Sequence, residues 1–148
     1  VQDTRTVFHT SNKQIHIAPI ICYESIYGAF VGDYVKNGAQ LLFIITNDGW
    51  WGDTPGYKQH LSYASLRAIE TRREIARSAN TGTSAIVNSR GDISLQTAWW
   101  EEAVIKTKLT TSNHLTFYVK YGDYLGYLAA LLSGLTILFY IYTSIKRS

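Results

Sequence analysis

Cysteine and proline are scarce in this sequence. Its 148 residues include one cysteine, Cys22, and two prolines, Pro19 and Pro55. A single cysteine cannot form an internal disulfide, so cysteine usage does not indicate a redox compartment. Low-complexity tracts and internal repeats are also absent. With 46% apolar and 17% charged residues, the composition is that of an ordinary globular chain.

The motifs of several common sites are missing as well. The four histidines have no metal-ligand spacing, and we expect neither a metal nor a cofactor. Neither a G-x-S-x-G elbow nor a glycine-rich phosphate loop occurs. The formal net charge is +3, but no basic run is longer than two residues. The sequence therefore predicts no binding of nucleic acid, which requires a clustered basic face.

A long uncharged stretch lies near the C-terminus. Residues 124–145 contain no charged side chain, and tyrosines gather at both ends of the stretch. About 20 apolar residues in a helix span a bilayer, and tyrosines suit its two interfaces. We predict a transmembrane helix over about 124–145, within a C-terminal unit 121–148; a buried helix of a soluble core is the alternative. Lys146 and Arg147 favour a cytoplasmic C-terminus, with residues 1–120 on the external face.

The first 120 residues read as an α/β unit. Residues 16–21 and 41–46 are apolar and predict buried strands, the first weakened by Pro19. Residues 26–36 and 57–78 predict helices. Further strands are expected over 84–88, 93–97, 102–108 and 116–119, the first two as a hairpin. On the long helix, charged residues are expected to face away from the core: Arg67, Glu70, Arg73, Glu74 and Arg77.

Cys22 stands where a predicted strand ends and a helix begins. Such an elbow presents a side chain at the carboxyl edge of a sheet. Backbone N–H groups at a helix start favour the thiolate and can receive a developing oxyanion. Cys22 is therefore a candidate nucleophile, and a small buried apolar side chain is the alternative.

Polar and aromatic residues near the same edge are further candidates. Glu24 either positions a substrate amine or lysine, or is an acid favoured by the helix dipole. Asn47, with Asp48, ends the neighbouring strand and should point to the edge of Cys22, unless the two only form a turn. Trp50 and Trp51 lie on a glycine-flanked loop, where they would line a pocket or touch lipid.

These residues form a recognisable set. It comprises Ile21-Cys22-Tyr23-Glu24-Ser25, the run Thr46 to Gly52, Gln59-His60, Arg67 to Glu70, and Arg77 to Gly82. The set resembles the C-terminal half of the nitrilase, or carbon–nitrogen hydrolase, superfamily. More narrowly it resembles the apolipoprotein N-acyltransferases of bacterial envelopes. The terminal helix and Tyr121-Gly122-Asp123 before it support the narrower resemblance.

The resemblance implies a fold and a site. The fold is the C-terminal half of a nitrilase-like αββα sandwich, residues 1–120, followed by one transmembrane helix. The family triad is Glu-Lys-Cys, and its cysteine matches Cys22. Tyr23 would give a backbone N–H to the oxyanion hole, with Glu24 and Trp50 around the active site. The triad Glu and Lys belong to the preceding half of the domain. Because the chain starts without a methionine or signal pattern, we expect that half upstream of Val1.

The resemblance also implies a reaction, a location and partners. Cys22 would take an acyl chain from a phospholipid donor and pass it to the N-terminal amine of a diacylglyceryl apolipoprotein. The site would lie on the external face of the bacterial inner membrane, with the rest of the same enzyme as a further partner. A membrane-tethered amidase or nitrilase, or an inactive half-domain that only binds, are the alternatives.

Overall fold

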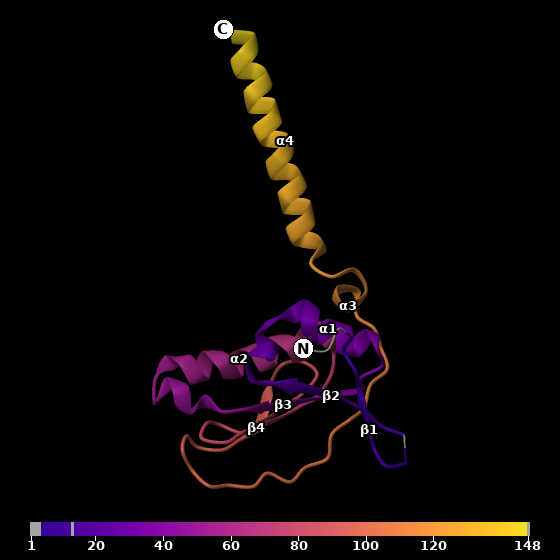
Figure 1. Cartoon of the computed structure of the whole chain (residues 1–148), viewed down its shortest axis with the longest axis vertical. Coiled ribbons are helices and arrows are strands. Elements are labelled where there is room, and N and C mark those ends of the chain that lie inside the picture. Colours follow the sequence, from indigo (N-terminus) through magenta and orange to yellow (C-terminus); the bar gives the residue numbers. More distant parts are fainter. Residues whose placement is uncertain (1–3, 13, 148) are drawn as a thin grey trace.

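The computed structural model describes residues 4–12 and 14–147, which build one six-stranded sheet and an isolated C-terminal helix (Figure 1). The strands follow the sheet in chain order: β1 (Phe8–His9), β2 (His16–Ile21), β3 (Leu41–Thr46), β4 (Ile75–Ala79), β5 (Ala85–Val87) and β6 (Ile93–Gln96). β2, β3 and β4 are parallel, and the remaining pairs are antiparallel. The predicted strands 16–21 and 41–46 are confirmed at both ends.

Pro19 fits the sheet because of its place in β2. β1 pairs only with His16 and Ile17. At Pro19, β2 therefore has a ladder partner on one side alone, where Phe43 of β3 is aligned with it. Proline is tolerated at such edge-like positions because a missing N–H need not break a ladder bond.

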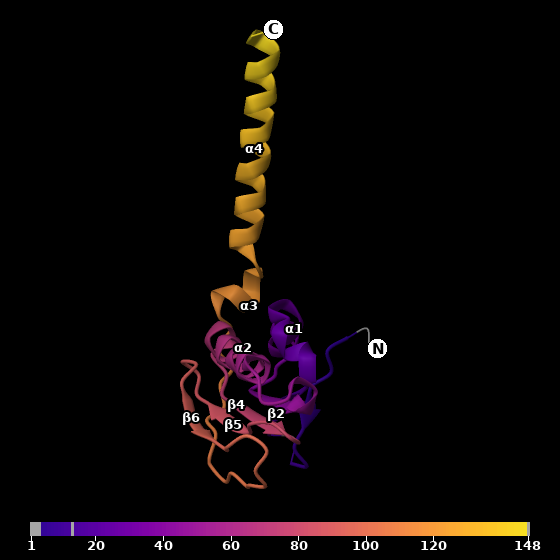
Figure 2. The same ribbon diagram turned by 90° about the vertical axis from the view of Figure 1, so that its left-hand side faces the viewer.

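Two helices cover one face of the sheet. α1 (Gly28–Lys36) and α2 (Pro55–Thr71) lie between the sheet and the C-terminal helix (Figure 2). Their buried side chains meet those of the central strands in one core, which includes Val31, Val35, Ala64, Ala68, Ala18, Ile20, Leu42 and Ile44. One helical layer on one sheet is the predicted half of an αββα sandwich.

The predicted helix 57–78 is wrong in its last third. α2 ends at Thr71, Arg72 takes a left-handed conformation with φ of 53°, and Ile75–Ala79 form β4. Residues 42–46 of β3 pair with this segment, so sheet pairing outweighs its helical periodicity.

The arginines expected on the exposed face are also buried. Arg67, Arg73 and Arg77 are each at most 3% exposed. Hydrogen bonds explain how such burial is tolerated: Arg73, for example, donates to the carbonyls of Ala39 and His114. These three arginines thus stabilise the interior rather than the surface.

Three smaller predictions are corrected. Residues 102–108 form no strand among the described residues. Residues 117–121 form a short helix, α3 (Phe117–Tyr121), because the Thr116 hydroxyl accepts from the Val119 N–H and caps a helical turn. The helix expected to begin at residue 26 begins at Gly28, and a 3-10 turn over Cys22–Ile26 precedes it. The predicted hairpin is confirmed by β5 and β6.

The last helix stands away from the sheet. α4 (Tyr124–Arg147) contains the predicted span 124–145 and projects from the helical side of the sheet (Figure 1). Within the described residues it is the single helix long and apolar enough to cross a membrane, and no residue of Tyr124–Lys146 is buried.

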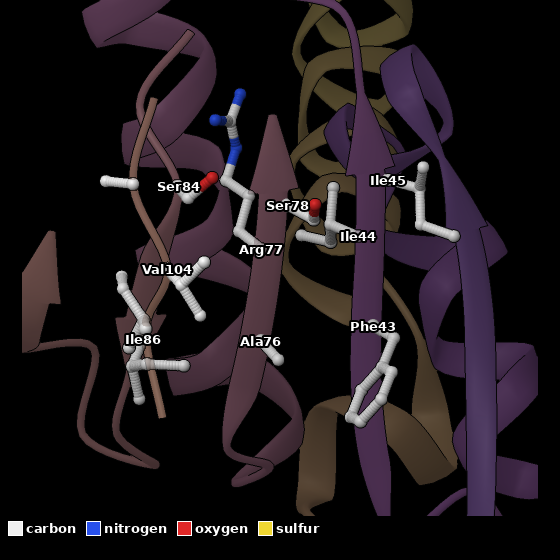
Figure 3. A pocket seen from close by; sticks show the side chains of 11 residues that line it. Phe43, Ile44, Ile45, Ala76, Arg77, Ser78, Ser84, Ile86 and Val104 are labelled. Carbon is white, nitrogen blue, oxygen red and sulfur yellow. The ribbon is translucent and has the colours of Figure 1, made fainter. Parts of the chain in front are cut away.

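The other face of the sheet carries exposed apolar side chains. Phe43, Ile45 and Ile86 line a groove of about 400 Å³ there, beneath a loop that includes Val104 (Figure 3). Ile45 is 54% exposed, which is unusual for the centre of a sheet.

Candidate active site

Cys22 occupies a strained turn at the carboxyl end of β2. Its φ is 50°, a left-handed conformation that costs a residue with a side chain about 1–3 kcal/mol. The strand ends at Ile21 and the 3-10 turn begins at Cys22 itself. This geometry is the predicted elbow, in which a sharp strand-to-helix turn exposes a nucleophile.

The thiol is half-buried and lies next to the neighbouring strand. The Thr46 hydroxyl, at the end of β3, donates to Sγ of Cys22 at 3.3 Å. The same hydroxyl lies 3.2 Å from a carboxylate oxygen of Asp48. The ends of the two parallel strands therefore meet at the sulfur, as expected for one edge of a parallel sheet.

The Glu24 side chain binds back to the end of the strand that leads into the elbow. Its carboxylate accepts a hydrogen bond of 2.8 Å from the backbone N–H of Ile21. This contact resembles the return bond of a capping box, which satisfies a free donor at a helix start. In this structure Glu24 therefore stabilises the turn that carries Cys22.

Asn47 holds two loops together at the same edge. Its side-chain oxygen accepts from the Gly49 N–H at 3.1 Å and from the Thr81 hydroxyl at 2.7 Å. The Asx turn, which was the alternative for Asn47, is present, and Asn47 also joins the loop after β4 to the loop after β3.

The aromatic residues divide into a stack and a free ring. Tyr23 and Trp51 lie parallel, with ring centroids 5.8 Å apart, and each ring lies 5.6 Å from the imidazole of His60. Trp50 is 84% exposed, so it is available to a ligand or a lipid surface. Of the two tryptophans considered as site residues, Trp51 thus packs against the elbow, whereas Trp50 lies on the surface near it.

A buried polar network lies under the elbow. Arg77 donates to both carboxylate oxygens of Asp48, at 2.9 and 2.8 Å, and to the Thr83 carbonyl. Nδ1 of His60 lies 3.0 Å from Oδ1 of Asp48. All of Arg77, Asp48 and His60 are at most 3% exposed.

The other side of the imidazole faces the elbow backbone. Nε2 of His60 lies 3.3 Å from the Cys22 carbonyl oxygen and 3.1 Å from the Ser25 hydroxyl. That hydroxyl in turn donates to the Cys22 carbonyl at 2.8 Å. Contacts at both ring nitrogens, to Asp48 at Nδ1 and to Ser25 and the Cys22 carbonyl at Nε2, fix the orientation of the ring.

The charge of Asp48 is strongly favoured. Burial alone would raise the pKa of this carboxyl, but hydrogen bonds from His60 and Arg77 and the charge of Arg77 outweigh burial. The pKa therefore lies below its ordinary value, and Asp48 is ionised at neutral pH. Across residues 4–12 and 14–147, no three His, Cys, Asp or Glu side chains are arranged to hold a metal ion.

The chain matches a known family over most of its length. Residues 2–113 match the carbon–nitrogen hydrolase family. The chain belongs to the carbon–nitrogen hydrolase family.

Relatives of this hydrolase family support the narrower resemblance. The chain is 36% identical over 136 residues to an apolipoprotein N-acyltransferase of Chlorobaculum tepidum, covering 90% of this chain and 26% of that protein. It is 45% identical over 91 residues to the one of Sinorhizobium medicae, covering 62% and 17%. The chain thus spans about a quarter, or less, of the length of these curated relatives.

Solved structures of carbon–nitrogen hydrolases share the fold. An amidase mutant of Nesterenkonia sp. AN1, with acrylamide added at its active-site cysteine, superposes with a TM-score of 0.55 at 16% identity, covering 91% of this chain and 50% of that one. Nit3 of Saccharomyces cerevisiae gives 0.55 at 18% identity, covering 68% and 39%. At these identities the likeness concerns the fold alone.

Sequence reasoning missed the buried part of this carbon–nitrogen hydrolase site. Asp48 was expected at the edge of Cys22 but with no partner, His60 was given no role of its own, and Arg77 was placed on the outside of a helix. The alternation of Ile75, Arg77 and Ala79 has the period of a strand, and in the structure this strand lies beside β3 with Arg77 aligned with Ile44.

Proposed function

We propose that this chain is the C-terminal part of a bacterial apolipoprotein N-acyltransferase, with Cys22 as its nucleophile. The observation that carries the proposal is the strained elbow, which puts Sγ of Cys22 beside Thr46 at the carboxyl edge of the sheet. The named relatives give the acyl-transfer chemistry, and the exposed apolar helix α4 gives a membrane context in which both substrates would lie.

The proposed reaction has two covalent steps. In the first, the Cys22 thiolate attacks the ester carbonyl of a phospholipid and forms an acyl thioester, and the lysophospholipid alkoxide leaves with the proton taken from the thiol. In the second, the α-amine of a diacylglyceryl-cysteine attacks the thioester and loses a proton, which forms an amide and regenerates the thiol. A Glu base and a Lys, from the preceding half of the domain, would complete the triad.

Residues around the elbow would support these steps. The Tyr23 N–H is proposed as an oxyanion donor because it directly follows the nucleophile. Trp51 packs on Tyr23 and would shield the thioester, while Trp50 is exposed enough to guide acyl chains. Glu24 and Asn47 would keep the two flanking loops in place through the bonds described above.

The face of the sheet that carries no helix (Figure 2) supports the existence of a partner half. The groove lined by Phe43, Ile45 and Ile86 would be covered by the second sheet of an αββα sandwich, built from the part of the enzyme that supplies Glu and Lys. The isolated chain 1–148 is then expected to be inactive. We place the sheet on the external face of the inner membrane and the end of α4 in the cytoplasm.

Acyl transfer can be tested by intact mass. The full-length protein in phospholipid vesicles is expected to gain one acyl mass on Cys22 and to lose it when a diacylglyceryl-cysteine peptide is added. Cys22→Ala should reduce transfer below about 1% of wild type and leave membrane insertion unchanged. Transfer retained in Cys22→Ala would exclude Cys22 as the nucleophile.

A membrane-tethered amidase is the second candidate, because one of the solved structures that share this fold is an amidase with an adduct at its active-site cysteine. In that case water replaces the lipid amine. Release of ammonia from short amides, without an acyl adduct from phospholipid, would favour the amidase over the acyltransferase.

A further inference from the structure

The buried network under the elbow has no role in the two covalent steps, yet it contacts the nucleophile's own backbone. We propose that His60, held by Asp48 and Arg77, is a positioning residue that aims the Tyr23 N–H at the oxyanion. This inference rests on the proposed function, since it concerns how the same elbow stabilises a tetrahedral intermediate.

The argument begins with the peptide group between Cys22 and Tyr23. A trans peptide is planar, so its C=O and its N–H point in opposite directions. The Cys22 carbonyl is held on the buried side by the Ser25 hydroxyl at 2.8 Å and lies 3.3 Å from Nε2 of His60. Fixing that carbonyl on the buried side directs the Tyr23 N–H to the opposite side, away from the network.

The elbow needs such a restraint because its backbone is strained. The φ of 50° at Cys22 is held only if surrounding contacts compensate for its cost. Ser25 and His60 supply contacts to the carbonyl of this very residue. Without them the peptide plane would be free to rotate toward a less strained conformation, which would turn the N–H away.

The restraint is rigid because each member of the network is itself fixed. Arg77 binds both oxygens of Asp48, and Asp48 binds Nδ1 of His60. The rings of Tyr23 and Trp51 lie against the imidazole and exclude water from it. In such a dry site, hydrogen bonds are stronger than in water, so the ring stays in one orientation.

The burial of the network excludes Ser25 as a second nucleophile. Asp48, His60 and Ser25 are spaced like the Asp-His-Ser triad of serine hydrolases, at 3.0 and 3.1 Å. Ser25 is only 1% exposed, however, so no substrate carbonyl can reach its hydroxyl. The network therefore acts through the backbone of Cys22 and not as a second nucleophile.

Two isosteric variants of His60 in the full-length protein test the inference. In His60→Asn the amide lies at the place of Nδ1 and keeps the bond to Asp48, but it does not reach the Cys22 carbonyl. In His60→Gln the amide nitrogen lies near the place of Nε2 and can donate to that carbonyl. We expect His60→Asn to lower kcat for acyl transfer about 10- to 100-fold with KM unchanged, and His60→Gln to restore most of it.

Alkylation of Cys22 by iodoacetamide separates positioning from a general structural role. Alkylation is a displacement with no tetrahedral oxyanion, so its rate should stay within about threefold in His60→Asn while acyl transfer falls. Equal losses in both rates, or no loss in either, would overturn the proposal. His114→Asn, at an exposed histidine, is the matched control and should change neither rate.

A milder variant and a second substrate keep the test decisive. If His60→Asn does not fold, Ser25→Ala removes one of the two carbonyl contacts and should lower acyl transfer about 3- to 10-fold, again without slowing alkylation. If the wild-type protein does not take acyl groups from phospholipid, the proposed function fails. Hydrolysis of a p-nitrophenyl ester through Cys22 then replaces that step and still tests the positioning role by itself.

Discussion

Two buried arginine–carboxylate pairs lie near opposite ends of α2, and they differ in how completely they are bonded. Asp48 receives bonds on both oxygens from Arg77 and a further contact from His60. Glu70 receives one bond from Arg67, at 3.0 Å. Among the described residues, Oε2 of Glu70 and Nε of Arg67 are buried without a hydrogen-bond partner.

The electrostatics of the two carboxyls follow this difference. For Glu70, burial raises the pKa, and the charge of Arg67 offsets only part of the increase. For Asp48, hydrogen bonds and charge outweigh burial and lower the pKa. A buried carboxylate is thus stabilised by the number of its bonds, and one ionic partner is not enough.

The two pairs also serve different neighbours. The Asp48 pair supports the elbow through His60, whereas Arg67 donates to the Ile26 carbonyl and lies near Tyr118 of α3, the helix that precedes α4. The fully bonded pair therefore lies under the proposed nucleophile, and the partly bonded pair lies near the start of α4.

Removing each arginine should produce the largest contrast. Arg77→Met leaves Asp48 ionised and buried, and we expect a loss of about 3–5 kcal/mol of unfolding free energy. Arg67→Met leaves Glu70, which can take up a proton because its pKa is already raised, so the loss should be about 1–3 kcal/mol. Unfolding followed by tryptophan fluorescence measures both.

Arg90→Ala is the control, because Arg90 and Asp92 form an ion pair at the surface. Such pairs contribute at most about 1 kcal/mol. If Arg67→Met cost as much as Arg77→Met, the distinction between the two pairs would be lost.

The contrast also shows what sequence could and could not predict. The strands 16–21 and 41–46, the elbow at Cys22 and the terminal helix were predictable, because each depends on a local pattern of apolar residues and its interruption. The end of α2 was not. Neither glycine nor proline follows Thr71, and only pairing with β3 turns residues 75–79 into a strand.

The buried network was unpredictable for the same reason. Asp48, His60 and Arg77 come from three elements, and their contact depends on Arg77 lying in a strand paired with β3. A helical reading of residues 72–78 placed that side chain in solvent. Long-range pairing therefore decided both the largest error in the fold and the largest omission in the site.

Two glycines allow a smaller and more local test. A Cβ at Gly82 would come within 2.7 Å of Cγ of Asp48, which is held by several bonds. A Cβ at Gly28 would meet the Tyr118 hydroxyl and, at 2.7 Å, Nη1 of Arg67, which are ends of longer side chains. We expect Gly82→Ala to cost about 3 kcal/mol and Gly28→Ala about 1 kcal/mol of unfolding free energy.

Activity sharpens this second test. Gly82→Ala should also slow acyl transfer, because it displaces Asp48 and with it His60, while Gly28→Ala should not. Gly32→Ala in the same helix as Gly28 is the control: its Cβ would meet nothing within 4 Å, so the gain in helix propensity should raise stability by about 0.5–1 kcal/mol. An unaffected Gly82→Ala would mean that Asp48 is not held as tightly as its bonds indicate.

The smallest expected effect is a difference in the sign of pH dependence. Asp48 has a lowered folded pKa, so its contribution to stability is present above about pH 3.9 and is lost as the pH falls through the folded value. Glu70 has a raised folded pKa, so its contribution is present below about pH 4.3 and is lost as the pH rises through the folded value.

The stability of wild type relative to Glu70→Gln should therefore fall as the pH is raised above about 4.3, by about 1.4 kcal/mol for each pKa unit of the shift. Relative to Asp48→Asn it should stay constant from about pH 5 to 8 and fall only in acid. Thermal midpoints of the three proteins across this range measure both trends. If the wild type instead became more stable relative to Glu70→Gln as the pH rises, Arg67 would fully compensate the Glu70 charge.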